Sequence, residues 1–276
     1  AALASVSAFA QSSVTLSGGV SASYQKAVGG TANVSRTDAF MKIAATEDLG
    51  GGLKVAADVS MDFGKRGTTE GGTTAPATTN SGLSISSASL GTLAYANVAA
   101  ASTRLSGGES GPSDLNGLLG GDLAVSQVKY TLPTLVNGLT LAVDATDGAT
   151  VDNETPITYT IGYAYGPASV TWDHRDSDKR QRLAVSYDAG VAKFGLTTDL
   201  KADDENEFSV TVPMGAVTLG LHYVSEKLPN HASGTAVSAN YALSKRTSIL
   251  GSVFNMKSDA AAYNGNAYRV RLLHTF

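Results

Sequence analysis

The sequence predicts an all-β chain that closes as one 16-stranded antiparallel transmembrane β-barrel. Apolar and polar residues alternate with a period of two along most of the 276 residues, and the connections between these segments alternate between short and long. Only 16% of the residues are charged, below the roughly 25% usual in soluble domains. Because successive side chains of a strand point to opposite faces, a wall between lipid and water requires such alternation.

Composition excludes several other classes of protein. No stretch is apolar over the roughly 20 residues that a transmembrane helix needs, since even the uncharged stretch 71–103 is rich in Thr, Ser, Gly and Asn. The net charge is −4 and Lys and Arg form no stripe, which argues against a nucleic-acid partner. The chain has no Cys, so disulfide scaffolds and thiolate metal sites are excluded. We expect no cofactor.

The N-terminal residues 1–10 are expected to be the rear part of a secretory signal peptide. They are apolar and small, and they end in Ala8-Phe9-Ala10, an A-x-A cleavage pattern. An ordinary apolar strand is the alternative. The signal-peptide interpretation makes residues 11–276 a single barrel domain that starts at Gln11.

The alternation begins directly after that point. Val14 and Leu16 share one face, and Ser13 and Thr15 share the other. A single alternating strand is also typical of a soluble sandwich, whereas alternation in nearly every segment favours a membrane barrel. The same pattern recurs along the chain at 20–25, 53–63, 139–144, 157–165, 180–187, 217–223 and 268–276.

The connections indicate a closed ring. Short turns at one rim and longer loops at the other are typical of transmembrane barrels, and an even number of strands leaves no unpaired edge in lipid. Tight turns are predicted at 48–52, 90–91, 133–138, 166–167, 188–190, 213–215 and 243–247. Longer or more polar links alternate with them at 27–34, 65–81, 101–123, 147–154, 173–178, 201–204, 225–233 and 257–264. About 16 segments result, each long enough for the roughly 9–11 residues that cross a bilayer at a tilt.

The last strand carries the most specific pattern. Tyr268, Val270, Leu272 and Phe276 lie on one face and end in a terminal aromatic residue. This arrangement resembles the strand by which outer-membrane proteins of Gram-negative bacteria are recognised during assembly. The resemblance implies the barrel-assembly machinery as a partner.

Further motifs extend a resemblance over nearly the whole chain. They are Ser12–Leu16 (SSVTL), Thr46–Lys54 (TEDLGGGLK), Val128–Pro133 (VKYTLP) followed by Asn137–Leu139 (NGL), Tyr187–Lys193 (YDAGVAK) and Asn240–Thr247 (NYALSKRT). With these pieces in this order, the sequence resembles the general porins of Gram-negative bacteria, most closely those of the beta-proteobacterial branch.

The resemblance implies a homotrimer in the outer membrane, in contact with membrane lipid and lipopolysaccharide, that passes small hydrophilic solutes and ions. Its tight turns would be periplasmic, and its third extracellular loop would fold into the lumen and narrow it. That loop corresponds to the longest connection, 101–123, which contributes Arg104, Glu109, Asp114 and Asp122.

The sequence departs from the family on the wall that would oppose this loop. Relatives present a ladder of Arg and Lys there, but the corresponding second-strand positions hold Phe40, Lys42 and Ala44. The strand before the loop has Asn97 where relatives have the Arg of a Gly-Arg pair. Part of the basic ladder is therefore missing.

Charge on the lumenal face predicts the ion selectivity of the pore. Alternation assigns ten bases to this face, namely Lys42, Lys54, Lys129, Arg175, Arg180, Arg182, Lys193, Lys201, Arg269 and Arg271. It assigns six acids to the same face, namely Asp58, Asp62, Asp144, Asp173, Asp199 and Glu207. The loop adds one base and three acids, so the balance predicts weak selectivity with a slight anion preference. The strongest candidates are Arg180 with Arg182 and Arg269 with Arg271, because each pair shares a face; a solvated or ion-paired side chain is the alternative for every one of these residues.

The sequence leaves three alternative functions: a substrate-specific channel of the same fold, an outer-membrane barrel enzyme, and an adhesin. The histidines, His174, His222, His231 and His274, show no metal-ligand spacing, and only His222 is expected to face the lumen, so we expect no catalytic residue. An adhesin needs larger loops. A specific channel needs an aromatic track in the lumen, whereas Trp172 and most tyrosines fall on the outer face, as in an interfacial girdle. A non-specific pore is the favoured interpretation.

Overall fold

The structure, a computed structural model, describes residues 12–63, 66–67, 78–99, 124–147, 155–201, 205–226, 232–259 and 264–276. All regular elements of this part of the chain are strands. It contains no helix long and apolar enough to cross a membrane. The predicted signal segment 1–10 and the predicted inward loop 101–123 lie outside the described residues.

The strands follow one another along the chain with the predicted connections between them. Their bounds are β1 Ser12–Lys26, β2 Asn33–Gly50, β3 Leu53–Asp62, β4 Arg66–Gly67, β5 Thr78–Ser87, β6 Gly91–Ala99, β7 Ala124–Thr131, β8 Leu139–Thr146, β9 Ile157–Tyr165, β10 Ala168–Arg175, β11 Gln181–Asp188, β12 Lys193–Lys201, β13 Asn206–Met214, β14 Val217–Glu226, β15 Ala232–Ala242, β16 Thr247–Lys257 and β17 Gly265–Thr275. β3 and β4 both pair with β2, one after the other along its length. β3 and β4 therefore form one strand of the ring, and the 17 segments make 16 strands.

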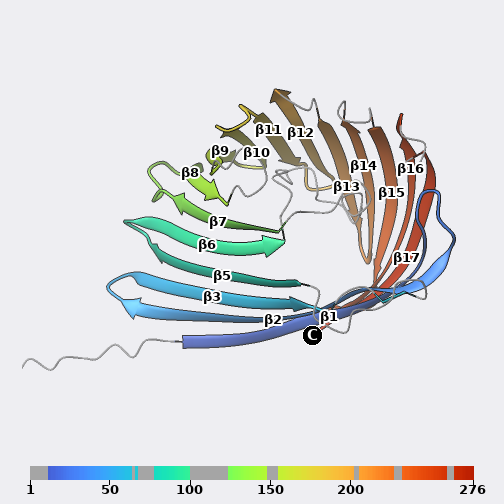
Figure 1. Ribbon diagram of the computed structural model, residues 1–276, viewed down its shortest axis with the longest axis horizontal. Coiled ribbons are helices and arrows are strands. Elements are labelled where there is room, and N and C mark those ends of the chain that lie inside the picture. Colours follow the sequence, from blue (N-terminus) through green and yellow to red (C-terminus); the bar gives the residue numbers. More distant parts are fainter. Residues whose placement is uncertain are drawn as a thin grey trace, which may run out of the picture.

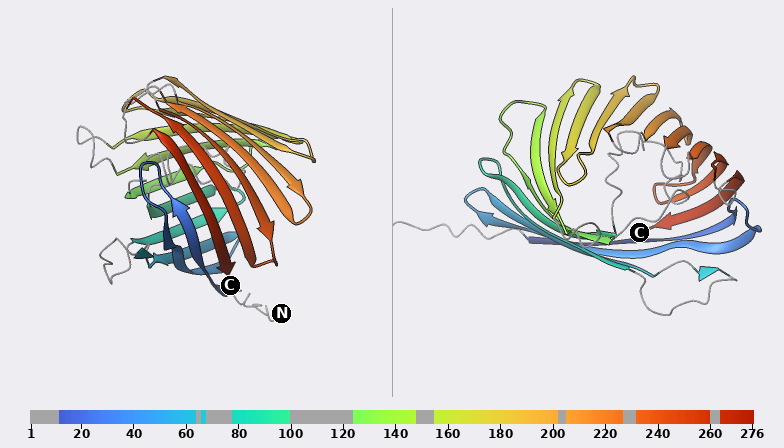
Figure 2. Two further views of the ribbon diagram at one scale, coloured as in Figure 1. Left: turned by 90° about the vertical axis from the view of Figure 1, so that its right-hand side faces the viewer. Right: turned by 45° about the horizontal axis from the view of Figure 1, so that its top comes forward.

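The sheet is closed. Each strand pairs antiparallel with its neighbours in sequence, and the ring ends where β17 pairs with β1, from Gly19 opposite Thr275 to Lys26 opposite Tyr268. Figures 1 and 2 show the sheet curving round until β1 lies beside β17. The predicted 16-stranded antiparallel barrel is confirmed.

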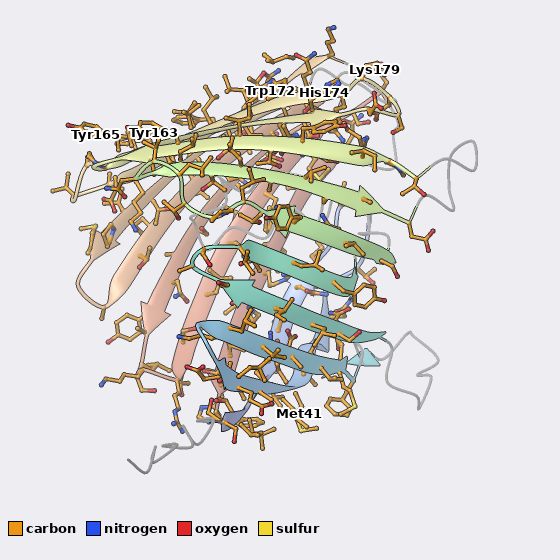
Figure 3. All side chains as sticks on the ribbon, turned by 90° about the vertical axis from the view of Figure 1, so that its left-hand side faces the viewer. Met41, Tyr163, Tyr165, Trp172, His174 and Lys179 are labelled. Atoms are coloured by element: carbon orange, nitrogen blue, oxygen red, sulfur yellow. The ribbon has the colours of Figure 1, made fainter. Side chains whose placement is uncertain are left out.

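The two faces of the wall differ in chemistry. Residues that are directly opposite in register share a face, so the faces can be followed from strand to strand. Outward side chains are mostly apolar and exposed, as for Val14 and Leu16 at 73% and 58%. Inward side chains are mostly polar, and Ser21 and Ser23 of the same strand are buried. Figure 3 shows Trp172, Tyr163 and Tyr165 on the outer surface of the barrel.

One irregularity in register changes a predicted orientation. At the end of β12, Asp199 lies opposite Arg182 but Lys201 lies opposite Gln181, so Leu200 is an extra residue in the strand. A β-bulge of this kind re-aims the side chains that follow it. Simple alternation put Lys201 on the lumenal face with Asp199; this was wrong, because the bulge places Lys201 on the outer face with Gln181.

The inner face also holds apolar side chains that the alternation did not predict. Leu250, Phe254 and Met256 of β16 point inward and are buried at 2%, 4% and 3% exposure. Phe254 packs with Ala236 and Ala267, and Val28 of the β1–β2 connection packs against this cluster. The outward residues of β16 are mixed, with Ile249 and Val253 apolar and Asn255 and Lys257 polar, so this strand gives no clear alternation signal.

The seam between β1 and β17 is built on two adjacent glycines. Gly18 and Phe276 exchange both backbone hydrogen bonds, at 3.1 and 3.0 Å. A Cβ on Gly18 would lie 2.5 Å from the ring of Phe276, and a Cβ on Gly19 would lie 2.9 Å from the ring of Phe40. The two rings therefore cover the glycine pair, Phe276 on the outer face and Phe40 on the inner face.

Candidate functional site on the inner wall of the barrel

The inner wall carries the predicted lumenal charges at successive strands. On β2 and β3, Lys42 Nζ lies 3.1 Å from Asp58 Oδ2, and both side chains remain partly exposed. Gly82 of β5 lies opposite Asp58, and a Cβ there would lie 2.6 Å from Asp58 Oδ1. The absence of a side chain at Gly82 thus leaves room for the carboxylate. Lys54 lies at the turn end of β3, opposite Asp48 and Ser86.

A buried ion-pair cluster joins β11, β12 and the start of β13. Arg182 Nε donates to Asp199 Oδ1 at 2.8 Å, and Arg180 Nε donates to Asp199 Oδ2 at 3.0 Å. Glu205 Oε2 accepts from both guanidinium groups at 3.4 Å. The side chains of Asp199 and Arg182 are 0% and 3% exposed. Two of the four strongest candidate bases are therefore neutralised within the wall, which is the alternative that the sequence left open.

Further charges continue this belt around the ring. Lys129 of β7 lies opposite Asp144 of β8, and Asp173 of β10 lies opposite Arg182. Lys193 Nζ lies 3.2 Å from Asp188 Oδ2 near the turn between β11 and β12. Acids and bases are thus interleaved on the inner face.

The loop between β10 and β11 is held by its own charges. Asp178 accepts from the guanidinium of Arg175 and, at 3.1 Å, from the backbone N–H of Arg180. Burial acts to raise the pKa of Asp178, but these hydrogen bonds and the Arg175 charge together lower it below its usual value. The hydrogen bond and charge of Lys179, at 2.6 Å, likewise lower the pKa of Asp176. Both carboxylates stay ionised into the acidic range, so the loop keeps these contacts at neutral pH.

The one histidine expected in the lumen lies on the inner face of β14. His222 Nε2 is 3.9 Å from Glu207 Oε2, and both side chains are buried. Ser209 lies opposite His222, and Thr211, Ser238 and Ser252 lie on the same inner face. An imidazole and a carboxyl group among hydroxyl groups make this part of the wall polar. No group of three metal-ligating side chains occurs among the described residues.

The second pair of candidate bases lies at the seam. Arg269 and Arg271 of β17 face inward, opposite Gln25 and Ser23 of β1. Arg269 Nε donates to Gln25 Oε1 at 3.0 Å. Both arginines are partly exposed. The predicted loop residues Arg104, Glu109, Asp114 and Asp122 lie outside the part of the chain that the structure describes.

The assembled geometry is a closed, apolar-coated ring around a polar, charged interior. The model of the Gram-negative porin family matches residues 1–261, nearly the whole chain. The chain belongs to the Gram-negative porins. Family and fold together make this porin a passive channel of the outer membrane, in which hydrophilic solutes diffuse through the water-filled lumen. The family and the fold are those of a channel rather than of an enzyme.

Solved porin structures share the fold. An anion-selective porin from Comamonas acidovorans is 19% identical, with 96% of this chain and 100% of that chain covered and a TM-score of 0.67. A mutant porin of Rhodopseudomonas blastica is 15% identical over the same shares, with a TM-score of 0.68. OmpF of Salmonella typhi in complex with daunomycin is 12% identical over 95% and 97%, with a TM-score of 0.66. No curated protein matches this porin.

Proposed function

We propose that this porin is a homotrimeric general pore for small hydrophilic solutes and ions, with a slight anion preference. The observation that carries the proposal is the inner wall, where polar and charged side chains line a closed ring without one dominant sign. A pore lined in this way filters solutes by size and by the local field, and it consumes nothing.

The anion preference is assigned to Arg269 and Arg271. Arg180 and Arg182 lie in a cluster with two carboxylates, so their positive charge is largely cancelled before it reaches the lumen. Lys42 and Lys193 likewise each form an ion pair, with Asp58 at 3.1 Å and with Asp188 at 3.2 Å. Arg269 and Arg271 lie on the same inner face of β17 and are both partly exposed, so their guanidinium groups add positive charge at one side of the ring.

Selectivity measurements on matched arginine variants test this assignment. We expect Arg269→Gln/Arg271→Gln to shift the reversal potential under a KCl gradient towards cations. A unit charge about 8 Å away in water contributes about 0.5 kcal/mol, or roughly a twofold change in ion partition for each charge removed. Arg246→Gln, in the periplasmic turn before β16, is the control and should leave the potential unchanged. An unchanged potential in the double variant would remove these arginines from the selectivity filter.

We further propose that the segment 101–123 narrows the lumen. Support comes from an asymmetry of burial, because inner-face side chains of β13 to β16 are buried while Lys42 and Asp58 on β2 and β3 are 45% and 36% exposed. A wall open to water leaves its side chains exposed, so the wall of β13 to β16 requires a cover. Val28 covers a part of it.

Deletion of residues 107–121 tests the narrowing. We expect single-channel conductance to rise, because the narrowest part of a pore dominates its resistance. Deletion of residues 149–153, in another loop at the same rim, is the control and should leave conductance as it is. Equal conductance in both variants would contradict the proposal.

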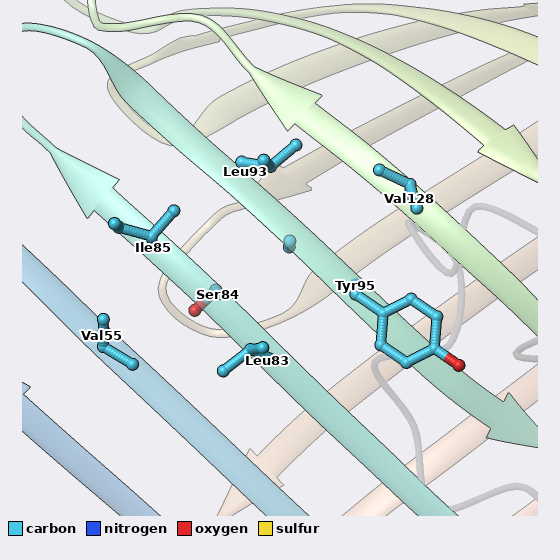
Figure 4. Close-up of a pocket in the computed structure, with 8 residues that line it drawn as sticks. Val55, Leu83, Ser84, Ile85, Leu93, Tyr95 and Val128 are labelled. Atoms are coloured by element: carbon cyan, nitrogen blue, oxygen red, sulfur yellow. The ribbon is translucent and has the colours of Figure 1, made fainter.

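The trimer is proposed to form on the outer wall of β2, β3 and β5. Membrane-facing walls carry aromatic girdles, but the described outward side chains of these three strands include no aromatic residue. They are mainly aliphatic or small, such as Ile43, Ala45 and Val59, with Glu47 at the turn end. Small residues let protein surfaces approach closely in membranes. An apolar groove of about 410 Å³ borders this wall, lined by Val55, Leu83, Ser84, Ile85, Leu93, Ala94, Tyr95 and Val128 (Figure 4).

The terminal strand is proposed as the assembly signal for the barrel-assembly machinery. The register with β1 places four residues on the outer face at the C-terminus: Tyr268, Val270 and Leu272 in β17, and Phe276 directly after it. The rings of Tyr268 and Tyr24 lie 5.9 Å apart across the seam. The same side chains that would be recognised during assembly thus pack against the first strand in the closed barrel.

A further inference from the structure

The turn between β11 and β12 closes on an ion pair at the rim of tight turns. Asp188 Oδ1 accepts the backbone N–H of Gly190 at 2.9 Å, and Asp188 Oδ2 lies 3.2 Å from Lys193 Nζ. Asp188 and Lys193 lie directly opposite each other on the inner face of the wall. The carboxylate and the ammonium group of this turn therefore neutralise each other.

The turn between β2 and β3 starts from the same residue types and ends differently. Asp48 Oδ1 again accepts the backbone N–H of the glycine two residues later, Gly50, at 2.9 Å, and Lys54 lies opposite Asp48 on the inner face. The aspartate and the lysine are six positions apart here and five positions apart in the β11–β12 turn. The register accordingly shifts between Asp48 and Gly50, and a shift of this kind re-aims the side chains around it. Lys54 forms no ion pair with any residue in the described ranges.

A hollow of about 380 Å³ opens beside Lys54. The inner-face residues that border it are Ser13, Thr46, Asp48, Lys54, Ala56 and Ser86. They come from β1, β2, β3 and β5, which lie next to one another in the lower part of Figure 1. Ala56 has the smallest side chain of the six, so the wall is thinnest there. Small-molecule sites have volumes of roughly 300–1,000 Å³, so the hollow has room for a small solute.

The hollow offers charges of both signs together with hydroxyl groups. The exposed ammonium group of Lys54 is a donor for a carboxylate. Asp48 binds its own turn through Oδ1, and a carboxylate has a second oxygen that accepts from an ammonium group. The hydroxyl groups of Ser13 and Thr46 lie 2.6 Å apart, and such a pair keeps one donor and further acceptor capacity for a ligand.

We propose that this hollow binds small zwitterionic solutes, in the first place free amino acids, at the mouth of the pore. The solute carboxylate binds Lys54, its ammonium group binds Asp48, and its side chain lies over Ala56 among the hydroxyl groups. A solute with one charge makes only one of these two contacts. The β11–β12 turn does not bind such solutes, because its two charges already bind each other. The role of the site rests on the proposed pore function, because the hollow lines the path by which solutes pass.

A titration of the refolded porin with L-glutamine tests the site. The porin is held in detergent micelles at low ionic strength, where exposed charges are little screened, and binding is followed by saturation-transfer NMR of the solute. We expect saturable binding that weakens about fivefold in Lys54→Gln, or by about 1 kcal/mol, as for two unit charges in contact in water. Ala56→Leu, which fills the hollow and leaves every charge in place, should weaken binding as well. Lys193→Gln is the matched control and should bind like the native chain.

Two analogues of the solute decide the chemistry. L-Glutaminamide lacks the carboxylate and N-acetyl-L-glutamine lacks the ammonium group, so each should bind the native chain several-fold more weakly than L-glutamine. Lys54→Gln should leave the binding of L-glutaminamide unchanged. Equal binding of L-glutaminamide and L-glutamine would indicate a simple cation site made by Asp48 and Glu47, which also borders the hollow, and would overturn the proposal. Equal binding of N-acetyl-L-glutamine and L-glutamine would overturn it too.

Equal affinity of the native chain and Lys54→Gln for L-glutamine, or the absence of saturable binding, would likewise overturn the proposal. The binding measurement involves no current, whereas the pore is tested by the conductance of the native chain without added solute. A chain that conducts as expected and does not bind L-glutamine would remove this site and leave the pore. A chain that binds L-glutamine and does not conduct would remove the pore and leave the site.

Discussion

Replacing Gly18 by Val is expected to prevent closure of the barrel. A Cβ at this position would lie 2.5 Å from the Phe276 ring and 2.7 Å from the backbone oxygen of Phe40. The ring can turn away, but the backbone oxygen belongs to the β1–β2 ladder and has no room to move. Overpacking typically costs about 1–3 kcal/mol. Here the clash also strains the two hydrogen bonds between Gly18 and Phe276, which are the last of the closing seam.

The measurement is the fraction of chain that refolds into a heat-modifiable barrel, together with thermal stability of the folded fraction. Gly251→Val is the matched control, because Gly251 also lies in the middle of a strand but has nothing within 4 Å of its Cβ position. We expect the folded fraction to fall at least about tenfold for Gly18→Val, which corresponds to about 1.4 kcal/mol, and to stay near the native level for Gly251→Val. Removing the phenyl ring that the new Cβ would touch, in Gly18→Ala/Phe276→Leu, should raise the folded fraction above that of Gly18→Ala alone. Native-like refolding of Gly18→Val would show that the glycine is dispensable at the seam.

Replacing Asp199 by Asn is expected to destabilise the folded barrel by several kilocalories per mole. Asp199 is the shared acceptor of Arg180 and Arg182, and its side chain is fully buried. Breaking a buried ion pair by neutralising one partner typically costs about 3–5 kcal/mol, because the other charge remains buried without compensation. Glu205, at 3.4 Å from both guanidinium groups, compensates only in part.

Urea unfolding of the porin in detergent micelles or vesicles measures this effect. Asp188→Asn is the control, because Asp188 pairs with Lys193 at 3.2 Å with 46% and 53% of the two side chains exposed. Exposed pairs of this kind contribute about 0–1 kcal/mol. Equal stability of the two variants would mean that the cluster between β11 and β13 does not support the wall.

Alternation predicted the faces of the barrel well because the solvent on each side imposes it. Lipid requires apolar side chains such as Val14 and Leu16 outward, and water accepts the serines between them inward. The turn positions were predictable from local chemistry. Gly50 and Gly190 adopt positive φ, and each donates its backbone N–H to the carboxylate of an Asp two residues earlier.

Other features depend on register, which alternation does not encode. Arg180 and Arg182 share a face in the sequence pattern, but their neutralisation by Asp199 follows only from the pairing of β11 with β12. The bulge at Leu200 adds one residue and turns Lys201 outward without any mark in the local sequence. On β16 both faces mix apolar and polar residues, so the inward orientation of Phe254 and Met256 was not visible before the strands were paired.

Planar-bilayer conductance of the purified native chain, with its reversal potential under a KCl gradient, distinguishes an open general pore from a plugged or strongly selective barrel. We expect stepwise insertions in groups of three, a current proportional to voltage, and a small reversal potential on the anion side. A folded, heat-modifiable barrel that inserts without conducting, or one with strong cation preference, would contradict a general pore whose inner wall carries nearly balanced charge.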